Sequence, residues 1–356
     1  MSDRLDAAEQ DPRLRRALLG LNAAGILGGV LLRLLDARIH PFTPDQGFTL
    51  DLARGTWADL VARTAADTHP PLYYAVVKLW YELFPPTLHS AQVLSVIFAA
   101  ATMALAAAMA WRRFGPLAAA AATLCWAFSP YLIYWNHSTR NHQMLPLAIM
   151  AAIWCGWEWM RGGGRGWLWG VAGGWVLAFQ INYMAFPAGA AWGLAILAGE
   201  GPWQRKAACL GASIAGPVST LWWIEVLARH ATAGPGRHHF FQETVSPVYL
   251  YFHALFGAQV PYQPNKSGPL FWAQMALFAG VCVSAGRRVG RAWDAWVLLA
   301  LLPTLPIVVA KLWGMTLAER HLAFALPWFL VVWGVGVREV LGKISLREKR
   351  GEQKAK

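Results

Sequence analysis

Residues 167–199 read WLWGVAGGWVLAFQINYMAFPAGAAWGLAILAG and contain no charged side chain. A bilayer is crossed by about 20 predominantly apolar residues in a helix, so this stretch is too long for one crossing. The polar residues Gln180, Asn182 and Tyr183 lie near its middle. We therefore predict two membrane helices joined by a turn at 180–183.

Further apolar runs, each about long enough to cross a bilayer, lie at 17–35, 89–111, 116–133, 143–160, 206–228, 269–286, 292–310 and 321–338. Apolar residues make up 56% of the 356-residue chain, and charged residues make up only 14%. Soluble domains carry about 25% charged residues, so this composition excludes an ordinary soluble enzyme. It also excludes a disordered chain, which combines low hydrophobicity with high charge. We predict an all-α fold, a polytopic transmembrane helical bundle of about 10–11 membrane helices.

The 31 lysines and arginines outnumber the 19 acidic residues, and they stand in short clusters between the apolar runs. Cytoplasmic loops of membrane proteins carry such clusters, so we expect both termini in the cytoplasm. Charge dispersed in this way does not suit a nucleic-acid surface. We predict one integral membrane domain over 1–356, with a core module at 1–200 and a cytoplasmic tail at 339–356. The segments expected outside are 36–88, 134–142, 180–183, 229–268 and 311–320.

The first outer segment has a helical pattern of its own. Apolar and charged residues alternate over 46–66, which is typical of amphipathic helices that lie in the membrane interface. We expect Gly55 to break this pattern and Thr56 to cap a second helix together with Asp59. Residues 72–84 are apolar but span only about 20 Å as a helix, so we predict a partial or re-entrant helix on the outer side.

Polar and charged side chains gather in the outer segments. They are Asp45, Asp67 and His69 in the first segment, Asn136, His137, Arg140, Asn141 and His142 in the second, Gln180, Asn182 and Tyr183 at the turn, and Lys311, Glu319, Arg320 and His321 in the last. Carboxylates, histidines and arginines at the mouth of a membrane bundle are typical of a catalytic site that handles an anion. The alternative is that outer loops are polar because water surrounds them.

Four motifs in this set follow one another in a specific order. They are TPDQG at 43–47, DTHPPLYY at 67–74, SPYLIYWNHSTRNHQM at 129–144 and ERHLAFALP at 319–327. This series resembles the GT-C glycosyltransferases, above all the bacterial branch related to protein O-mannosyltransferases and to the aminoarabinose transferase of lipid A. The resemblance implies an enzyme of the bacterial inner membrane with its active site on the periplasmic side.

The resemblance further implies that a sugar moves from a polyprenyl-phosphate donor to a lipid, glycan or protein acceptor, with inversion at the anomeric carbon. Asp45 occupies the family's first acidic position, so we expect it to act as the general base. Donor-phosphate contacts are expected from His69, Arg140 and Arg320. Supporting roles are expected for Asp67, His142 and Glu319, and sugar or acceptor contacts for Asn182, Tyr183 and Glu225. Glu225 is included because a charge inside an apolar run is costly.

These roles have structural alternatives. An acidic residue before an interfacial helix, such as Asp45, often caps that helix. Glu319 and Arg320 also suit a plain salt bridge. A polar pair such as Asn182 and Tyr183 also suits a simple turn.

The family's acidic pair is commonly Asp-Glu, whereas the sequence here reads Asp45-Gln46. The base is in place, but one carboxylate of a metal site is missing. We expect Asp67 to orient His69 rather than to bind a divalent ion, because two carboxylates and one histidine are a sparse metal site. No metal site and no cofactor is predicted, although a divalent cation remains an alternative.

Two other functions compete with the enzyme. A transporter or flippase for a lipid-linked or anionic solute also places arginine and glutamate inside a bundle, but it favours inverted repeats, and we find none. A non-catalytic subunit of a larger membrane complex fits a chain shorter than many family members and lacking the second acidic residue. Membrane lipids are expected partners in every case.

Overall fold

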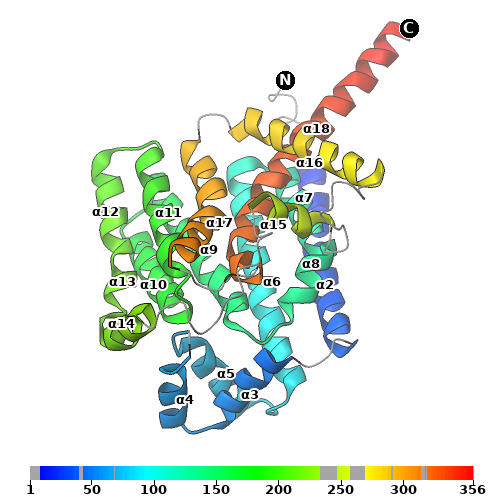
Figure 1. Ribbon diagram of the computed structural model, residues 1–356. Coiled ribbons are helices and arrows are strands. Elements are labelled where there is room, and N and C mark those ends of the chain that lie inside the picture. The colour runs from blue at the N-terminus through cyan, green and yellow to red at the C-terminus, as the bar shows by residue number, and fades with distance from the viewer. Residues whose placement is uncertain are drawn as a thin grey trace.

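The computed structural model shows a bundle of helices (Figure 1). It describes residues 9–39, 43–67, 69–232, 247–256, 269–289, 292–313, 317 and 319–355. The helices are α2 (Pro12–Ile39), α3 (Pro44–Arg54), α4 (Trp57–Thr64), α5 (Leu72–Leu83), α6 (Leu88–Phe114), α7 (Pro116–Phe128), α8 (Pro130–Asn136), η1 (Asn141–Gln143), α9 (Met144–Met160), α10 (Gly166–Ile181), α11 (Ala185–Ala198), α12 (Trp203–Ser213), α13 (Ala215–Val218), η2 (Leu221–Trp223), α14 (Ile224–Thr232), α15 (Pro247–Phe256), α16 (Pro269–Val289), α17 (Trp293–Trp313), η4 (Glu319–Ala325) and α18 (Leu326–Ala355). Every element in these ranges is helical, so the predicted all-α fold is confirmed.

The lengths and composition of the helices confirm an integral membrane protein. Among the described residues, five helical stretches are long and apolar enough to cross a bilayer, and the bent pair α7 and α8 makes a sixth if it counts as one span. The uncharged stretch 167–199 forms two helices as predicted, because α10 ends at Ile181 and α11 begins at Ala185. These two helices have 16 and 14 residues.

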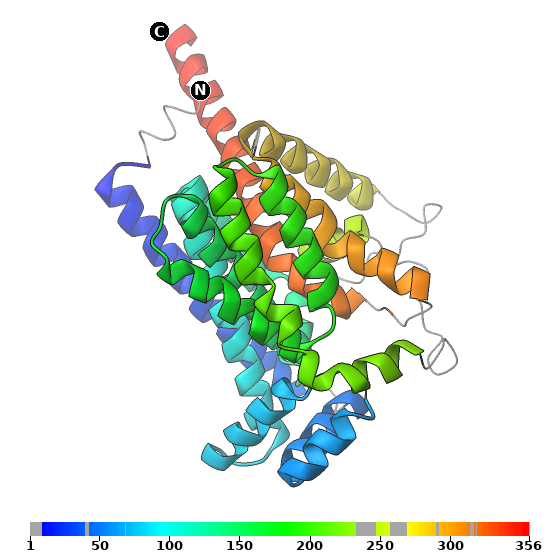
Figure 2. The same cartoon turned by 90° about the vertical axis from the view of Figure 1, so that its left-hand side faces the viewer.

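The two ends of the bundle carry different parts of the chain. Both termini lie at one end, and α3, α4 and α5 lie at the opposite end (Figure 1). The view turned by 90° shows the same separation (Figure 2). At the end with the termini, Arg113 of α6 pairs with Asp294 of α17 at 2.9 Å, and Arg338 of α18 pairs with Glu9 at 2.9 Å. The segment 43–83 is therefore positioned away from these basic residues.

The short helices of the first outer segment form as the sequence predicts. Gly55 ends α3, and Thr56 begins α4 with a capping box in which Asp59 is the reciprocal partner. The predicted partial helix is α5, which has 12 residues. Lys78 of α5 donates to the Gly55 carbonyl at 2.6 Å, which ties α5 to the end of α3.

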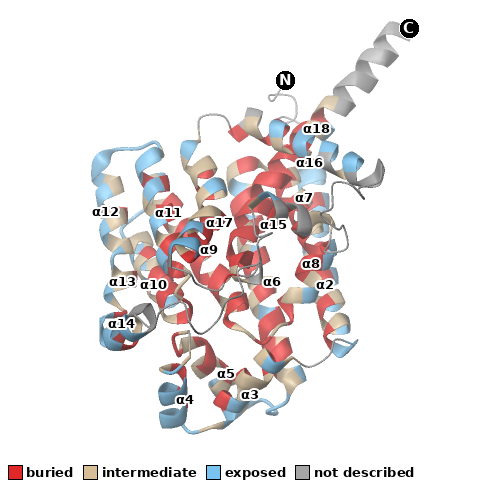
Figure 3. Cartoon of the chain, viewed as in Figure 1, coloured by how far each residue is buried: buried red, intermediate tan, exposed pale blue. Residues whose placement is uncertain are grey.

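Small residues allow the helices of the bundle to approach closely. A Cβ atom on Gly334 of α18 would collide with the Ala118 carbonyl of α7. Trp175, Trp192 and Trp328 are almost fully buried, although tryptophan favours membrane interfaces. Figure 3 shows the buried residues concentrated in the middle of the bundle, with exposed residues along α4 and α12. Membrane helices associate by this kind of close packing because lipid gives no hydrophobic drive.

Helices α15 and α16 of the C-terminal half pack against the bundle in different ways. Within the segment 229–268, α15 packs among the helices, with Leu250 and Ala254 fully buried and Tyr251 donating to the Leu299 carbonyl at 2.6 Å. This part of the segment 229–268 therefore packs against the other helices. Both views also show α16 lying across the bundle near the termini, rather than along it (Figures 1 and 2).

Packing of α2 on α7 gives a first test. A Cβ on Gly29 would lie 2.5 Å from the Trp126 ring, whereas a Cβ on the adjacent Gly28 would meet nothing within 4 Å. Overpacking a helix interface costs about 1–3 kcal/mol. We expect Gly29→Val to lower the apparent unfolding temperature in detergent and Gly28→Val to leave it unchanged. Equal unfolding temperatures for the two variants would contradict this packing.

Candidate active site

Asp45 lies in the first turn of α3 and is partly exposed. Thr43 is the N-cap of this helix, and its side chain accepts a hydrogen bond from the Gln46 backbone N–H. Pro44 occupies the first helical position, where its fixed φ and missing N–H do no harm. Asp45 is therefore not the helix cap, and the structural alternative for this residue does not apply.

The departure from the family's acidic pair has a structural explanation. Gln46 is 4% exposed, and its Oε1 atom accepts a hydrogen bond from the Thr43 N–H at 3.0 Å. Thr43 and Gln46 thus form the two halves of a capping box. The residue at the second acidic position faces its own helix terminus and stabilises the turn that carries Asp45.

Arg140 lies against this turn, although it is 95 residues away in the sequence. Its Nη1 atom donates to the Asp45 carbonyl at 3.4 Å, and its guanidinium carbon is 5.9 Å from the centre of the Phe48 ring. Its Nε atom is buried and has no hydrogen-bond partner among the described residues. The structure therefore brings the predicted base and the predicted phosphate ligand together.

The residues on either side of Arg140 share this property. Thr139 and Asn141 are fully buried. Thr139 Oγ1 and Asn141 Oδ1, like Arg140 Nε, have no hydrogen-bond partner among the described residues. An unmatched buried polar atom costs about 1–3 kcal/mol, so three neighbouring ones make this place a candidate for binding a polar group.

Asp67 joins the same group through α5. Its Oδ2 atom accepts a hydrogen bond from the Tyr74 hydroxyl at 3.3 Å, and the Tyr74 ring lies edge-on to Phe48 at 6.0 Å. Burial raises the pKa of the Tyr74 hydroxyl, and the charge of Arg140 acts in the opposite direction. Tyr74 is therefore a neutral donor that holds Asp67 near Arg140. His69 is half-buried two residues further on, before the Pro-Pro pair.

The turn between α10 and α11 places Asn182 and Tyr183. The Asn182 side chain accepts from the Met184 N–H at 2.8 Å, which is the turn role. The Tyr183 hydroxyl accepts from Trp223 Nε1 at 2.9 Å. Burial raises the pKa of Tyr183, and the nearby charge of Asp67 raises it further. Tyr183 therefore lies close enough to Asp67 for the charge of that carboxylate to act on its hydroxyl.

The remaining predicted residues are placed differently. Glu225 is exposed on α14, outside the buried group around Arg140. The side chains of Glu319 and Arg320 lie outside the described residues, although the backbone of both belongs to η4. His142 is buried, and its ring centre lies 5.3 Å from that of His321.

A small cavity of about 20 Å3 opens beside His142. Its polar lining comes from Thr102, Asn136, His142 and Gln143, and its apolar lining comes from α6, α7, α8, α9, η4 and α18. Among the described residues, no group of three histidine, cysteine or acidic side chains is arranged to hold a metal ion.

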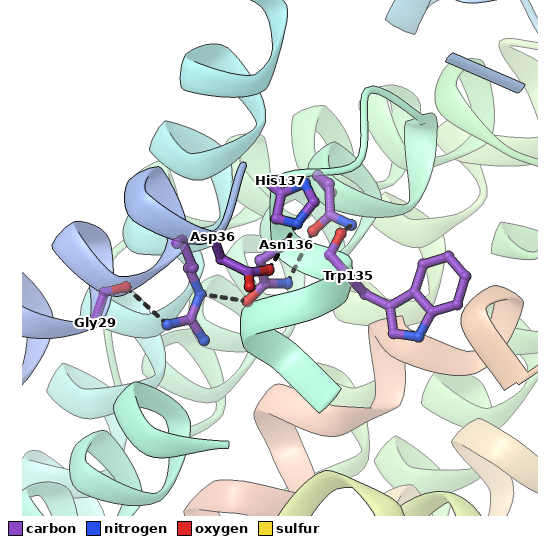
Figure 4. Close-up of polar contacts among 7 residues, drawn as sticks. Gly29, Asp36, Trp135, Asn136 and His137 are labelled. Atoms are coloured by element: carbon purple, nitrogen blue, oxygen red, sulfur yellow. Dashed lines mark hydrogen bonds and ion pairs between the residues drawn. The ribbon is translucent and has the colours of Figure 1, made fainter. Parts of the chain in front are cut away.

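Sequence reasoning missed Arg33 and Asp36 of α2. Arg33 is fully buried and donates to Asn136 Oδ1 at 2.9 Å, and Asp36 lies 3.0 Å from His137 Nε2. Figure 4 shows Asp36 and His137 pointing toward one another beside Asn136. The signal was present, because charged residues inside an apolar membrane helix are rare and generally functional.

Comparisons with known proteins give two kinds of match. Residues 68–223 match the sequence model of the family described as dolichyl-phosphate-mannose-protein mannosyltransferase. The sequence matches no curated protein.

Two solved structures of ArnT from Cupriavidus metallidurans resemble the fold. The apo state matches with a TM-score of 0.62 at 15% identity over 90% of this chain. The state bound to undecaprenyl phosphate matches with a TM-score of 0.58 at 17% identity over 89% of this chain. This chain spans 60% of the length of each ArnT chain.

The predicted resemblance is thus confirmed: residues 68–223 match the dolichyl-phosphate-mannose-protein mannosyltransferase family model, and the bundle has the fold of ArnT.

Proposed function

We propose that the protein is a membrane glycosyltransferase that moves a sugar from a polyprenyl-phosphate carrier to a lipid, glycan or protein acceptor. The observation that carries the proposal is the contact of Arg140 with the turn that holds Asp45, beside buried polar atoms that have no partner among the described residues. The reaction needs a base for the acceptor and a cation for the leaving phosphate, and these two residues supply both.

In this mechanism, Asp45 accepts the proton of an acceptor hydroxyl or amine. The acceptor oxygen or nitrogen forms a bond to the anomeric carbon as the bond from that carbon to the phosphate oxygen breaks. The bonding electrons leave with the polyprenyl phosphate, and attack from the opposite side inverts the anomeric carbon. Arg140 stabilises the negative charge that develops on the phosphate, because a guanidinium binds phosphate oxygens through a planar pair of donors.

Other residues of the group support these two. Asp67, held by the Tyr74 hydroxyl at 3.3 Å, orients His69 toward the phosphate. Arg320 supplies a second cation and Glu319 orients it, while His142 lines the adjoining cavity. The Asn182 side chain is engaged in the turn, so Tyr183 is the residue of this pair that contacts the sugar. Glu225 contributes only if the acceptor reaches the exposed face of α14.

Two observations support the identity of the donor and the side of the membrane. One of the ArnT structures is bound to undecaprenyl phosphate, a polyprenyl phosphate. The candidate site lies with α3 to α5 at the end of the bundle opposite both termini (Figure 1). With both termini in the cytoplasm, the site faces the periplasm of a bacterial inner membrane.

The role of Asp45 is tested by Asp45→Asn in purified protein offered a panel of polyprenyl-phosphate sugars. A general base contributes about 10²–10⁴-fold to rate, so sugar release should fall by at least about 100-fold. Donor binding, measured by thermal stabilisation, should remain, because the amide keeps the shape of the carboxylate. The matched control is Asp51→Asn on the same helix, where the exposed carboxylate pairs with Arg63 at 2.9 Å.

The outcomes separate the rival functions. Full sugar release by Asp45→Asn would overturn the assignment of the base. Binding of donors by wild type without turnover, together with full function of Asp45→Asn in cells, would favour the non-catalytic subunit. Movement of a lipid-linked solute across proteoliposomes without sugar release would favour the transporter.

The role of Arg140 is tested by binding of undecaprenyl phosphate. Hydrogen bonds to charged groups contribute about 1.5–3 kcal/mol, so Arg140→Gln should weaken binding about tenfold or more. Arg63→Gln is the control, because its guanidinium carbon also lies near the Phe48 ring, at 5.7 Å, but the side chain is exposed. Equal affinities for wild type and Arg140→Gln would contradict the phosphate role.

A further inference from the structure

Arg33 is a buried charge in a helix that is long and apolar enough to cross a membrane. It is 0% exposed, and its guanidinium carbon lies 3.7 Å from the centre of the Trp126 ring. A charged side chain in such a place is costly unless all its donors are used. The hydrogen bonds of the Arg33 guanidinium therefore decide whether the burial of this charge is tolerated.

The first set of hydrogen bonds repairs a break in a neighbouring helix. Helix α7 ends at Phe128, and the chain turns by 66° into α8. Pro130 has no N–H, so the Trp126 carbonyl four residues earlier lacks its helical donor. Arg33 Nη2 donates to this carbonyl at 2.8 Å, and Nη1 donates to the Ala127 carbonyl at 3.4 Å. Because Trp126 is buried, its carbonyl needs a donor from within the protein.

The second set holds the segment that follows. Arg33 Nε donates to Asn136 Oδ1 at 2.9 Å, and Asn136 Nδ2 donates to Gln143 Oε1 at 2.9 Å. Gln143 Nε2 in turn donates to the Trp135 carbonyl at 2.7 Å. One turn further along α2, Asp36 lies 3.0 Å from His137 Nε2. Both ends of the segment 137–142 are thus fixed to α2, directly at His137 and through Asn136 at Gln143.

The segment held in this way carries the polar atoms of the candidate site. Arg140 lies in its middle, flanked by Thr139 and Asn141, whose buried polar atoms have no partner among the described residues. Asn141 Nδ2 also donates to the Ile181 carbonyl at 3.4 Å, on the far side from α2. The segment 137–142 is therefore attached to α2 on one side and to the end of α10 on the other, and its conformation depends on both attachments.

We propose that Arg33 is a positioning residue for donor binding: through Asn136 and Gln143 it fixes the segment that presents Arg140 to the phosphate. This inference rests on the proposed function, because it needs a phosphate ligand at Arg140. Arg33 itself does not touch the reacting atoms. Its guanidinium is occupied by Gly29, Trp126, Ala127 and Asn136, all within the chain.

A double-mutant cycle tests this role. The variants are Arg33→Gln, Arg140→Gln and the double variant, and the readout is affinity for undecaprenyl phosphate in detergent, well below the unfolding temperature. We expect Arg33→Gln alone to weaken binding about tenfold, and to weaken it no further when Arg140 is already Gln, since coupled residues are not additive. A merely structural role would lower the unfolding temperature and leave affinity at low temperature unchanged.

Two further variants sharpen the result. Arg33→Lys keeps the charge but cannot reach two carbonyls and Asn136 with one planar group, so it should bind with intermediate affinity. Arg38→Gln on the same helix is exposed and should bind as wild type. If Arg33→Gln does not fold, Gln143→Leu takes its place. This variant removes the hydrogen bond between Asn136 and Gln143 and leaves the hydrogen bonds of Arg33 intact. It should then show the same loss of affinity and the same non-additivity with Arg140→Gln.

The outcomes distinguish this inference from the proposed function. If wild type binds undecaprenyl phosphate and Arg140→Gln weakens binding, unchanged affinity in Arg33→Gln or in Gln143→Leu overturns the positioning role alone. Losses that add fully in the double variant also overturn it. If folded wild type does not bind undecaprenyl phosphate, the proposed function fails and the positioning role fails with it.

Discussion

The break between α7 and α8 is the constraint on which the candidate site depends. Pro130 removes the donor for the Trp126 carbonyl, and Trp126 is buried, so another donor must come from within the protein. Arg33 supplies a donor from α2 at 2.8 Å, so the break and the buried charge occur together. The break directs the chain into α8 and then into the segment with Arg140. A feature that looks like a defect in one helix thereby sets where the cation of the site lies.

The same constraint operates at the other turns around the site. The Asn182 side chain caps the Met184 N–H between α10 and α11, and Gln180 Nε2 donates to the Ser219 carbonyl at 2.8 Å. Lys78 of α5 covers the Gly55 carbonyl at the end of α3. In each case a polar side chain satisfies backbone that a helix leaves open. The polar residues near this end thus divide into those that hold the backbone and those that are left for a ligand.

Local features of the fold were predictable from the sequence, and contacts between distant segments were not. Apolar runs and capping patterns gave the helices and the Thr56 cap, because these depend on neighbouring residues. The contact of Arg140 with the turn at Asp45 joins residues 95 positions apart, and only the predicted sidedness of the loops suggested it. The turn role of Asn182 was among the alternatives that the sequence offered, whereas hydropathy could not tell that Glu225 is exposed. The link from Arg33 to Asn136 spans 103 positions and had no local pattern at all.

Arg140 differs from Arg113 and Arg338 in its partners, and this contrast supports an anionic ligand. Near the termini, Arg338 is fully buried and meets the Glu9 carboxylate, and Arg113 meets both oxygens of Asp294. Each of these two guanidinium groups is therefore paired with a carboxylate of the chain itself. At the other end, Arg140 contacts a carbonyl, and its buried Nε has no partner among the described residues. A guanidinium that pairs with a carboxylate of the protein has a structural role. A guanidinium that is held in place with one donor unused can bind an anion from outside the protein, such as the phosphate of a polyprenyl donor.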